Sequence, residues 1–294
     1  MKRLLKWIMI GLASLMTFTL LATGLIYALS NRAMNQQYDY PLTDFKVVSD
    51  SNLVVEGARL AKVHGCSNGC HGDGGKGRQW LNLPGIKVTT PNLPKIFNTY
   101  SDAQLERSIR GGVKADGTSA LMMPSPTYYY LTDYDLSALI AYFRSLAPEA
   151  AVGPEAAFSF GMDIRYRMST GDYRFVADII SQQGPRQSEV DTTNLLQFGH
   201  YLAETSCGGC HGADFMGSSI GSGPTPSLKV VAAYSEAEFD RFLTTGIAKG
   251  ERETRMSKIA LKSFSHLTAN ELDALYAYFS DFAKAPLEIS EYTH

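Results

Sequence analysis

The longest apolar stretch of the chain lies close to its N-terminus. Residues 7–29 carry no charged side chain. As a helix they would span roughly 34 Å, enough to cross a hydrocarbon layer of about 30 Å. Lys2, Arg3 and Lys6 precede this stretch, and basic residues beside a span favour the cytoplasmic side. We therefore expect residues 1–31 to form a basic cytoplasmic end and a transmembrane anchor.

A cleaved signal peptide is the alternative interpretation of the same stretch, because Ala28, Leu29 and Ser30 could form a small-residue cleavage site. The apolar run is longer than the roughly 7–15 residues usual in a signal peptide, which favours a retained anchor. Both interpretations place the bulk of the chain across the membrane. We expect a single-pass protein of the inner membrane with its remaining domains in the periplasm.

Beyond the anchor, apolar residues recur mainly with helical spacing. Residues 133–146 and 268–282 both show this period and predict two long helices. Residues 101–110 and 235–244 each open with a serine suited to an N-cap and predict two shorter helices. No pair of alternating strands stands out, and the segments between helices are rich in glycine and proline. The pattern predicts an all-α fold.

The second half of the chain repeats the plan of the first. Each half contains, in the same order, a helix with a central glycine, two cysteines followed by histidine, a Thr-Pro pair, a helix, a methionine and a final helix. We expect one domain over residues 45–148 and a second over residues 192–286. Residues 149–191 belong to neither copy and are expected to form a linker, with one helix over residues 173–181.

The amino-acid composition excludes several classes of protein. Hydrophobic residues make up 45% and charged residues 19%, which excludes a disordered or collagen-like chain. The net charge of −2 provides no positive field to attract phosphates, so we expect no nucleic-acid partner.

The four cysteines form two tight clusters that carry the chemistry. Cys207, Cys210 and His211 form a C-x-x-C-H motif, which is typical of covalent c-type haem attachment. Two thiols add to the two vinyl groups of the porphyrin, and the adjacent histidine is then placed below the iron. Cys66 and Cys70 form the other pair, followed by His71, but three residues separate these cysteines. The flexible pair Asn68-Gly69 could absorb the extra residue.

Three other uses of the cysteines compete with haem attachment. A structural disulfide suits the compartment but leaves the two histidines unexplained. A redox-active pair would require a βαβ context, which the sequence lacks. A shared zinc site would need four ligands, and the two clusters lie about 140 residues apart in separate repeats.

Each half of the chain resembles a class I cytochrome c domain, and the whole resembles a membrane-anchored dihaem c-type cytochrome. The resemblance covers residues 52–146 and 193–282. It implies an all-α fold of two tandem domains, each wrapping one covalent haem c. It also implies that Gly57 meets Tyr142, and Gly199 meets Tyr278, where the first and last helices of each domain cross.

The resemblance further implies a methionine as the second axial ligand of each iron. In the first copy Met123 directly precedes Pro124, the position that the family uses, so we expect Met123 rather than Met122 to bind the iron. In the second copy Met256 is the expected ligand, although no proline follows it, and His266 remains the alternative. Axial histidine and methionine raise the haem potential and suit electron transfer.

The implied function is electron transfer between a redox enzyme and a respiratory acceptor at the periplasmic face, without catalytic residues of its own. The expected redox partner is a dehydrogenase or a terminal oxidase. The chain is similar to cytochrome c subunits of membrane-bound alcohol and sugar dehydrogenases, although those usually carry three haems and this chain has two motifs. The alternative is a dihaem cytochrome c peroxidase, which needs one haem with an open distal position. A candidate distal methionine in both copies argues against that enzyme.

Overall fold

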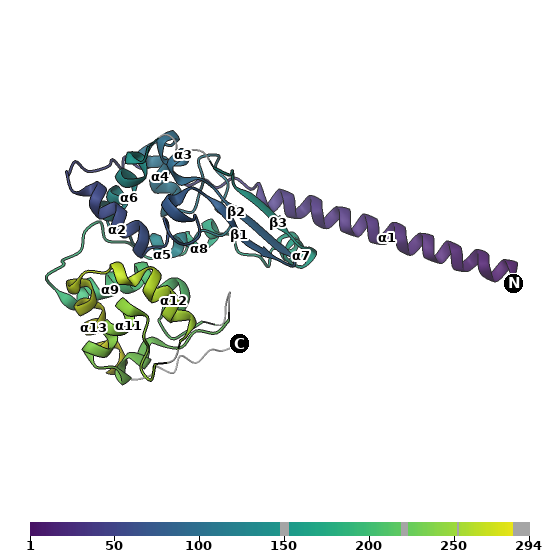
Figure 1. Ribbon diagram of the computed structural model, residues 1–294. Helices are drawn as coiled ribbons and strands as arrows, with labels where there is room; N and C mark the ends of the chain where they lie inside the picture. Colours follow the sequence, from purple (N-terminus) through teal and green to yellow (C-terminus); the bar gives the residue numbers. More distant parts are fainter. Residues whose placement is uncertain (148–152, 219–222, 252, 285–294) are drawn as a thin grey trace.

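The computed structural model describes residues 1–147, 153–218, 223–251 and 253–284. A long helix, α1 (Lys2–Met34), extends away from two helical domains that lie side by side (Figure 1). By length and composition α1 can cross a membrane, and its most apolar window is not buried by the protein. The mostly helical fold confirms the predicted all-α class.

Domain 1 is built on the crossing of its first and last helices, α2 and α6. Its buried core includes Leu60 of α2 and Leu136 and Ile140 of α6. Its helices are α2 (Leu53–Val63), η1 (Asp73–Gly75), α3 (Leu93–Thr99), α4 (Asp102–Ile109), α5 (Ser125–Tyr128) and α6 (Asp133–Ser145).

Domain 2 repeats this arrangement, with α9 packed on α13. Phe198 and Leu202 of α9 meet Leu275 and Phe279 of α13 in its core. Its helices are α9 (Leu195–Ser206), α10 (Gly208–His211), η3 (Leu228–Ala233), α11 (Glu236–Thr245), α12 (Arg255–Lys262), η4 (Phe264–His266) and α13 (Ala269–Lys284).

A glycine allows the two helices to approach closely in each domain. A Cβ atom on Gly57 would lie 1.9 Å from a carbonyl oxygen of α6 and 2.8 Å from Cβ of Tyr142. A Cβ atom on Gly199 would lie 2.1 Å from a carbonyl oxygen of α13 and 2.6 Å from Cβ of Tyr278. Real Cβ atoms do not approach so closely, so each crossing requires glycine. The expected glycine–tyrosine crossings are confirmed in both domains.

A small sheet departs from the sequence prediction. β1 (Arg78–Leu83), β2 (Ile86–Thr90) and β3 (Ala157–Phe160) form an antiparallel sheet in that order. The strands are short, the register of β1 slips between Gln79 and Leu81, and β3 lies about 70 residues beyond β2 in the chain. Because apolar and polar residues hardly alternate in strands this short and irregular, the sequence did not predict them.

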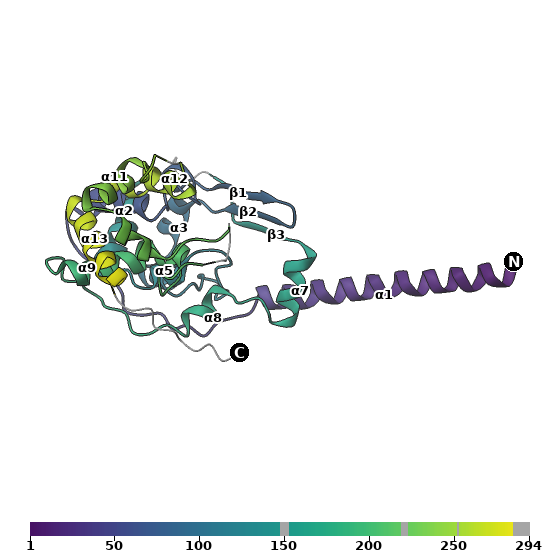
Figure 2. The same cartoon turned by 90° about the horizontal axis from the view of Figure 1, so that it is seen from below.

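The stretch expected to be a linker is structured where the structure describes it, over residues 153–191. It contributes β3, α7 (Met162–Thr170) and α8 (Val176–Ile180), the last within the helix expected at residues 173–181. α7 lies beside the C-terminal part of α1 in both views (Figures 1 and 2). The expected domain ends at 148 and 286 lie outside the described residues.

Polar and apolar contacts join the two domains. Arg59 of α2 pairs with Glu271 of α13, with 2.7 Å between Nη1 and Oε2, and also donates to the carbonyl oxygen of His266. Val63 of α2 packs into the core of domain 2. On another part of the interface, the hydroxyl of Tyr201 hydrogen-bonds the carboxylate of Asp135.

Candidate functional site

The first cysteine cluster follows α2 through a tight turn. Gly65 has a positive φ of 71°, and the amide of Gly69 donates to the Gly65 carbonyl at 3.0 Å. A Cβ on Gly69 would lie 2.4 Å from that carbonyl oxygen, so a larger residue does not fit. Asn68 turns toward domain 2 and donates to the carbonyl of Lys262 at 2.6 Å. The extra residue between Cys66 and Cys70 is accommodated by this compact loop.

The second cluster is a single helical turn. Cys207 lies between the two helices as the C-cap of α9 and the N-cap of α10, and the amide of His211 donates to the Cys207 carbonyl at 3.0 Å. Residues three apart in a helix lie on one face, so Cys207 and Cys210 point to the same side.

Both histidines are held by the same contact. Nδ1 of His71 lies 2.9 Å from the carbonyl oxygen of Pro91, and Nδ1 of His211 lies 2.9 Å from the carbonyl oxygen of Pro226. Because a carbonyl only accepts hydrogen bonds, Nδ1 carries the proton in each ring. Nε2 is then the nitrogen with a free lone pair, the form that binds a metal.

The Thr-Pro pairs that hold these rings were not assigned a role from the sequence. Thr90 Oγ1 donates to the Cys70 carbonyl at 2.9 Å, and Thr225 Oγ1 donates to the Cys210 carbonyl at 2.8 Å. Each threonine therefore ties its loop to a cysteine, while the next residue orients the histidine. The repetition of Thr-Pro after the histidine in both halves of the sequence could have indicated this role.

The surroundings of the thiols suit an apolar group better than a metal ion bound by thiolates. The cysteines are free thiols; Cys66, Cys70 and Cys207 are partly buried and Cys210 is exposed. Burial raises the pKa of Cys66 and of Cys207 to about 12, so these thiols stay neutral. Among the described residues, no group of three or more His, Cys, Asp and Glu side chains is arranged to hold a metal ion.

The two methionines of the first copy lie in different places. Met123 packs against the core of domain 1 together with Cys66. Met122 packs instead against a separate cluster around Phe160 and Phe175, beneath the segment after domain 1.

In the second copy Met256 packs against the same core as Cys207. His266 lies toward domain 1, where burial and the charges of Lys62 and Arg59 lower its pKa. Met256 thus lies on the same core as the second cysteine cluster, and its role as the iron ligand stays a prediction.

The two clusters face each other across the domain interface. A Cβ on Gly209 would lie 2.8 Å from Oγ1 of Thr127 in α5, so domain 1 touches the second motif. Burial raises the pKa of the neighbouring Tyr128, as would negative charge on Cys66, Cys70 or Cys210. No sequence pattern singled out α5, which lies between the two sites.

These residues fit two covalently attached haems. Each site combines two unpaired thiols, a histidine with Nε2 free and a methionine on the same apolar core. A porphyrin needs attachment points, an imidazole ligand and apolar side chains to pack against, and each domain provides all three.

Comparison with known proteins gives the same picture. The cytochrome c family matches residues 54–147 and 197–281. The chain is 24% identical over 281 residues to the alcohol dehydrogenase (quinone) cytochrome c subunit of Gluconacetobacter polyoxogenes, covering 84% of this chain and 59% of the relative. It is 28% identical over 175 residues to the gluconate 2-dehydrogenase cytochrome c subunit of Pantoea cypripedii, covering 54% of this chain and 38% of the relative.

A fructose dehydrogenase cytochrome subunit of Gluconobacter japonicus is 25% identical over 210 residues, covering 64% of this chain and 42% of the relative. The chain thus spans less than two thirds of the length of each of these relatives.

Proposed function

Because the chain belongs to the cytochrome c family, we propose that it carries two covalent haems and relays electrons from a dehydrogenase to a respiratory acceptor. Cys66 and Cys70 would hold one haem, and Cys207 and Cys210 the other. When bound, haem iron supplies a one-electron redox couple. Electron transfer itself follows from the family and from relatives that are cytochrome c subunits.

The protein's contribution is to orient and tune the iron. The carbonyls of Pro91 and Pro226 fix the rings of His71 and His211 with Nε2 free, and such hydrogen bonds from Nδ1 raise the basicity of Nε2. Met123 and Met256 would complete the axial sets, and a thioether ligand raises the potential.

One observation carries the proposal: the complete donor arrangement occurs twice, on equivalent elements. In both domains a histidine follows two free thiols, its Nδ1 donates to a proline carbonyl, and a threonine ties the same loop to the second cysteine. A chance motif would not reproduce these contacts in two places.

The proposed setting is the periplasmic face of the inner membrane. α1 would anchor the chain, with Lys2, Arg3 and Lys6 in the cytoplasm. Substrate oxidation would take place on a partner subunit, as the names of the relatives suggest, and this chain would itself be no enzyme.

The test is to purify the protein from membranes with its associated subunits and measure the intact mass and visible spectrum. We expect two covalent haem additions, low-spin spectra with a sulfur–iron band, and a co-purifying dehydrogenase. Cys207→Ala should leave the second haem weakly held, since only one thioether can form. A high-spin spectrum with peroxide turnover would favour the peroxidase alternative instead.

A further inference from the structure

The junction between α1 and the segment after domain 1 contains a hollow that electron transfer does not use. Its volume is about 360 Å³. Leu29, Arg32 and Gln36 line it from the end of α1 and the segment just after it, and Met168, Thr170 and Asp178 line it from the other side. It is therefore an open hollow bordered by two separate parts of the chain.

The wall opposite α1 is held firmly in place. Nη1 of Arg165 in α7 donates to Ser30 Oγ and to Asn31 Oδ1, both at 2.9 Å. Its guanidinium also lies over the ring of Tyr27, 4.2 Å from the centroid. Ser30 is fully buried by this contact, although the rest of α1 is mostly exposed. Figures 1 and 2 both show α7 running beside this end of α1.

The floor of the hollow is apolar and its rim is charged. Met168 and Phe175 are almost fully buried and pack with Ala33. At the rim, the guanidinium of Arg32 makes no hydrogen bond or ion pair within the described part of the chain. The carboxylate of Asp178 accepts from the amide of Phe175 and lies next to the hydroxyl of Tyr38, and among the described residues it forms no ion pair.

The position of the hollow along the axis of α1 indicates which kind of molecule occupies it. The uncharged run ends at Leu29, and the hollow extends from Leu29 to Gln36. If α1 spans a bilayer, this level is the headgroup layer. Leu25 and Leu29 are 59% and 40% exposed and continue the apolar surface from the hollow into the hydrocarbon layer.

We propose that this hollow binds one glycerophospholipid of the ethanolamine class. Arg32 binds the phosphate, the carboxylate of Asp178 receives the ammonium group, and the acyl chains lie along Leu25 and Leu29. Guanidinium and phosphate form strong charge-assisted hydrogen bonds. The proposal rests on the membrane anchoring in the proposed function, and it adds a specific lipid site between α1 and α7.

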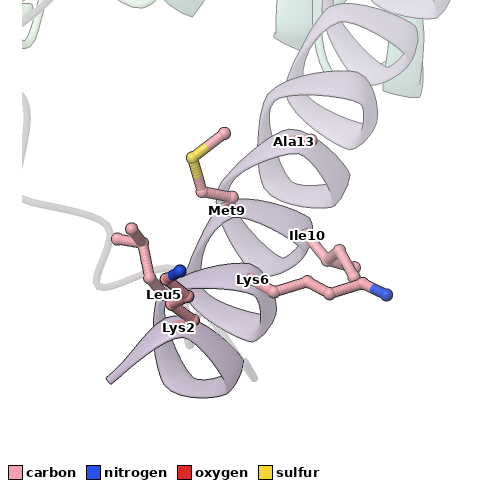
Figure 3. Close-up of a pocket in the computed structure, with 6 residues that line it drawn as sticks. All are labelled: Lys2, Leu5, Lys6, Met9, Ile10 and Ala13. Atoms are coloured by element: carbon pink, nitrogen blue, oxygen red, sulfur yellow. The ribbon is translucent and has the colours of Figure 1, made fainter.

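The other end of α1 provides an internal control. Figure 3 shows a second hollow there, lined by Lys2, Leu5, Lys6, Met9, Ile10 and Ala13. It has the same combination of basic and apolar side chains. All six residues belong to one helix, so no second wall fixes a ligand.

The experiment uses the full chain, reconstituted in bilayers of equal amounts of phosphatidylethanolamine and phosphatidylglycerol. After extraction into mild detergent, native mass spectrometry reports any retained lipid and its headgroup. We expect one phosphatidylethanolamine per wild-type chain. Arg32→Gln should lower the retained fraction about tenfold, as expected for loss of a charge-assisted hydrogen bond. Lys6→Gln should leave the fraction unchanged.

The headgroup preference is tested with Asp178→Asn, which keeps an acceptor for the Phe175 amide but removes the negative charge. We expect this variant to retain the two lipids equally. The proposal is overturned if the wild type retains no lipid, if Arg32→Gln retains as much as the wild type, or if Lys6→Gln causes an equal loss.

Resistance of the chain to alkaline extraction, measured on each sample, separates this site from the anchor. Loss of lipid retention in the wild type with α1 still embedded overturns the lipid site alone. Release of the wild-type chain overturns both the anchor and the lipid site.

Discussion

At the residue scale, the two methionine candidates of domain 1 can be separated by their surroundings. Met123 packs against the same core as Cys66, and Met122 packs against a separate cluster. We expect Met123→Leu to remove one of two sulfur–iron bonds, so the sulfur–iron absorption band should fall to roughly half and one haem potential should drop. Met122→Leu, a swap of similar volume, should change neither. An unchanged band in Met123→Leu would assign the ligand elsewhere.

Domain 2 allows a matched comparison of its two ligand candidates. Met256→Leu should remove the sulfur–iron band of the second haem, because Met256 packs against the same core as Cys207. His266→Gln should leave that band and both potentials unchanged, since His266 lies toward Arg59 and Lys62 of domain 1. Visible spectra and redox titration of each variant measure this. The reverse pattern would make His266 the ligand.

A carboxylate at the domain interface predicts a pH dependence of stability. Burial raises the pKa of Asp135 to about 6, above its usual 3.8, and the nearby Glu56 and Glu271 act in the same direction. The hydrogen bond from Tyr201 and the charge of Arg59 only partly oppose this. Between about pH 4 and pH 6 the folded state therefore binds more protons than the unfolded state, and stability falls as pH rises through that window.

Asp135→Asn should remove this part of the pH dependence, which is of the order of 1–3 kcal/mol. Denaturant unfolding of both proteins at pH 4, 5, 6 and 7 measures the difference. If the stability difference between the two proteins stays constant with pH, Asp135 keeps its ordinary pKa in the folded state.

At the scale of elements, the helix crossings depend on two glycines. Gly57→Ala and Gly199→Ala should each destabilise their domain by about 1–3 kcal/mol, because the added methyl overlaps a backbone carbonyl that cannot move alone. Gly184→Ala is the control, since no other atom lies within 4 Å of the place that its added methyl would take. Thermal unfolding followed in the haem band measures the effect. Equal behaviour of all three variants would contradict the close crossing.

At the scale of the whole molecule, Arg59 joins the domains through Glu271, whose side chain is 8% exposed. Arg59→Met should weaken the interface by about 1.5–3 kcal/mol and separate the unfolding of the two domains. Lys114→Met breaks the exposed pair with Asp116 and should change stability by less than about 1 kcal/mol. Calorimetry distinguishes one transition from two, and a single unshifted transition in Arg59→Met would refute the coupling.

Local patterns in the chain were sufficient for much of this protein. Helical period and N-cap residues predicted α4 and α6 of domain 1 and α11 and α13 of domain 2, and the match to the cytochrome c family confirms the resemblance. The grouping of Cys207, Cys210 and His211 follows from their spacing in the sequence, because residues so close together lie on one helical turn. Their role in holding haem stays a prediction. The apolar length of residues 7–29 likewise needs no tertiary information.

Tertiary structure decided what depends on residues far apart in the chain. The pairing of β3 with β2, the hydrogen bonds from His71 to Pro91 and from Asn68 to Lys262, and the hollow beside Arg32 each join segments that no local pattern connects. Periodicity reports which face of an element is apolar, but not which distant segment covers it. Contacts between distant segments form only when the whole chain packs, because their partners are selected by shape and by burial of polar groups.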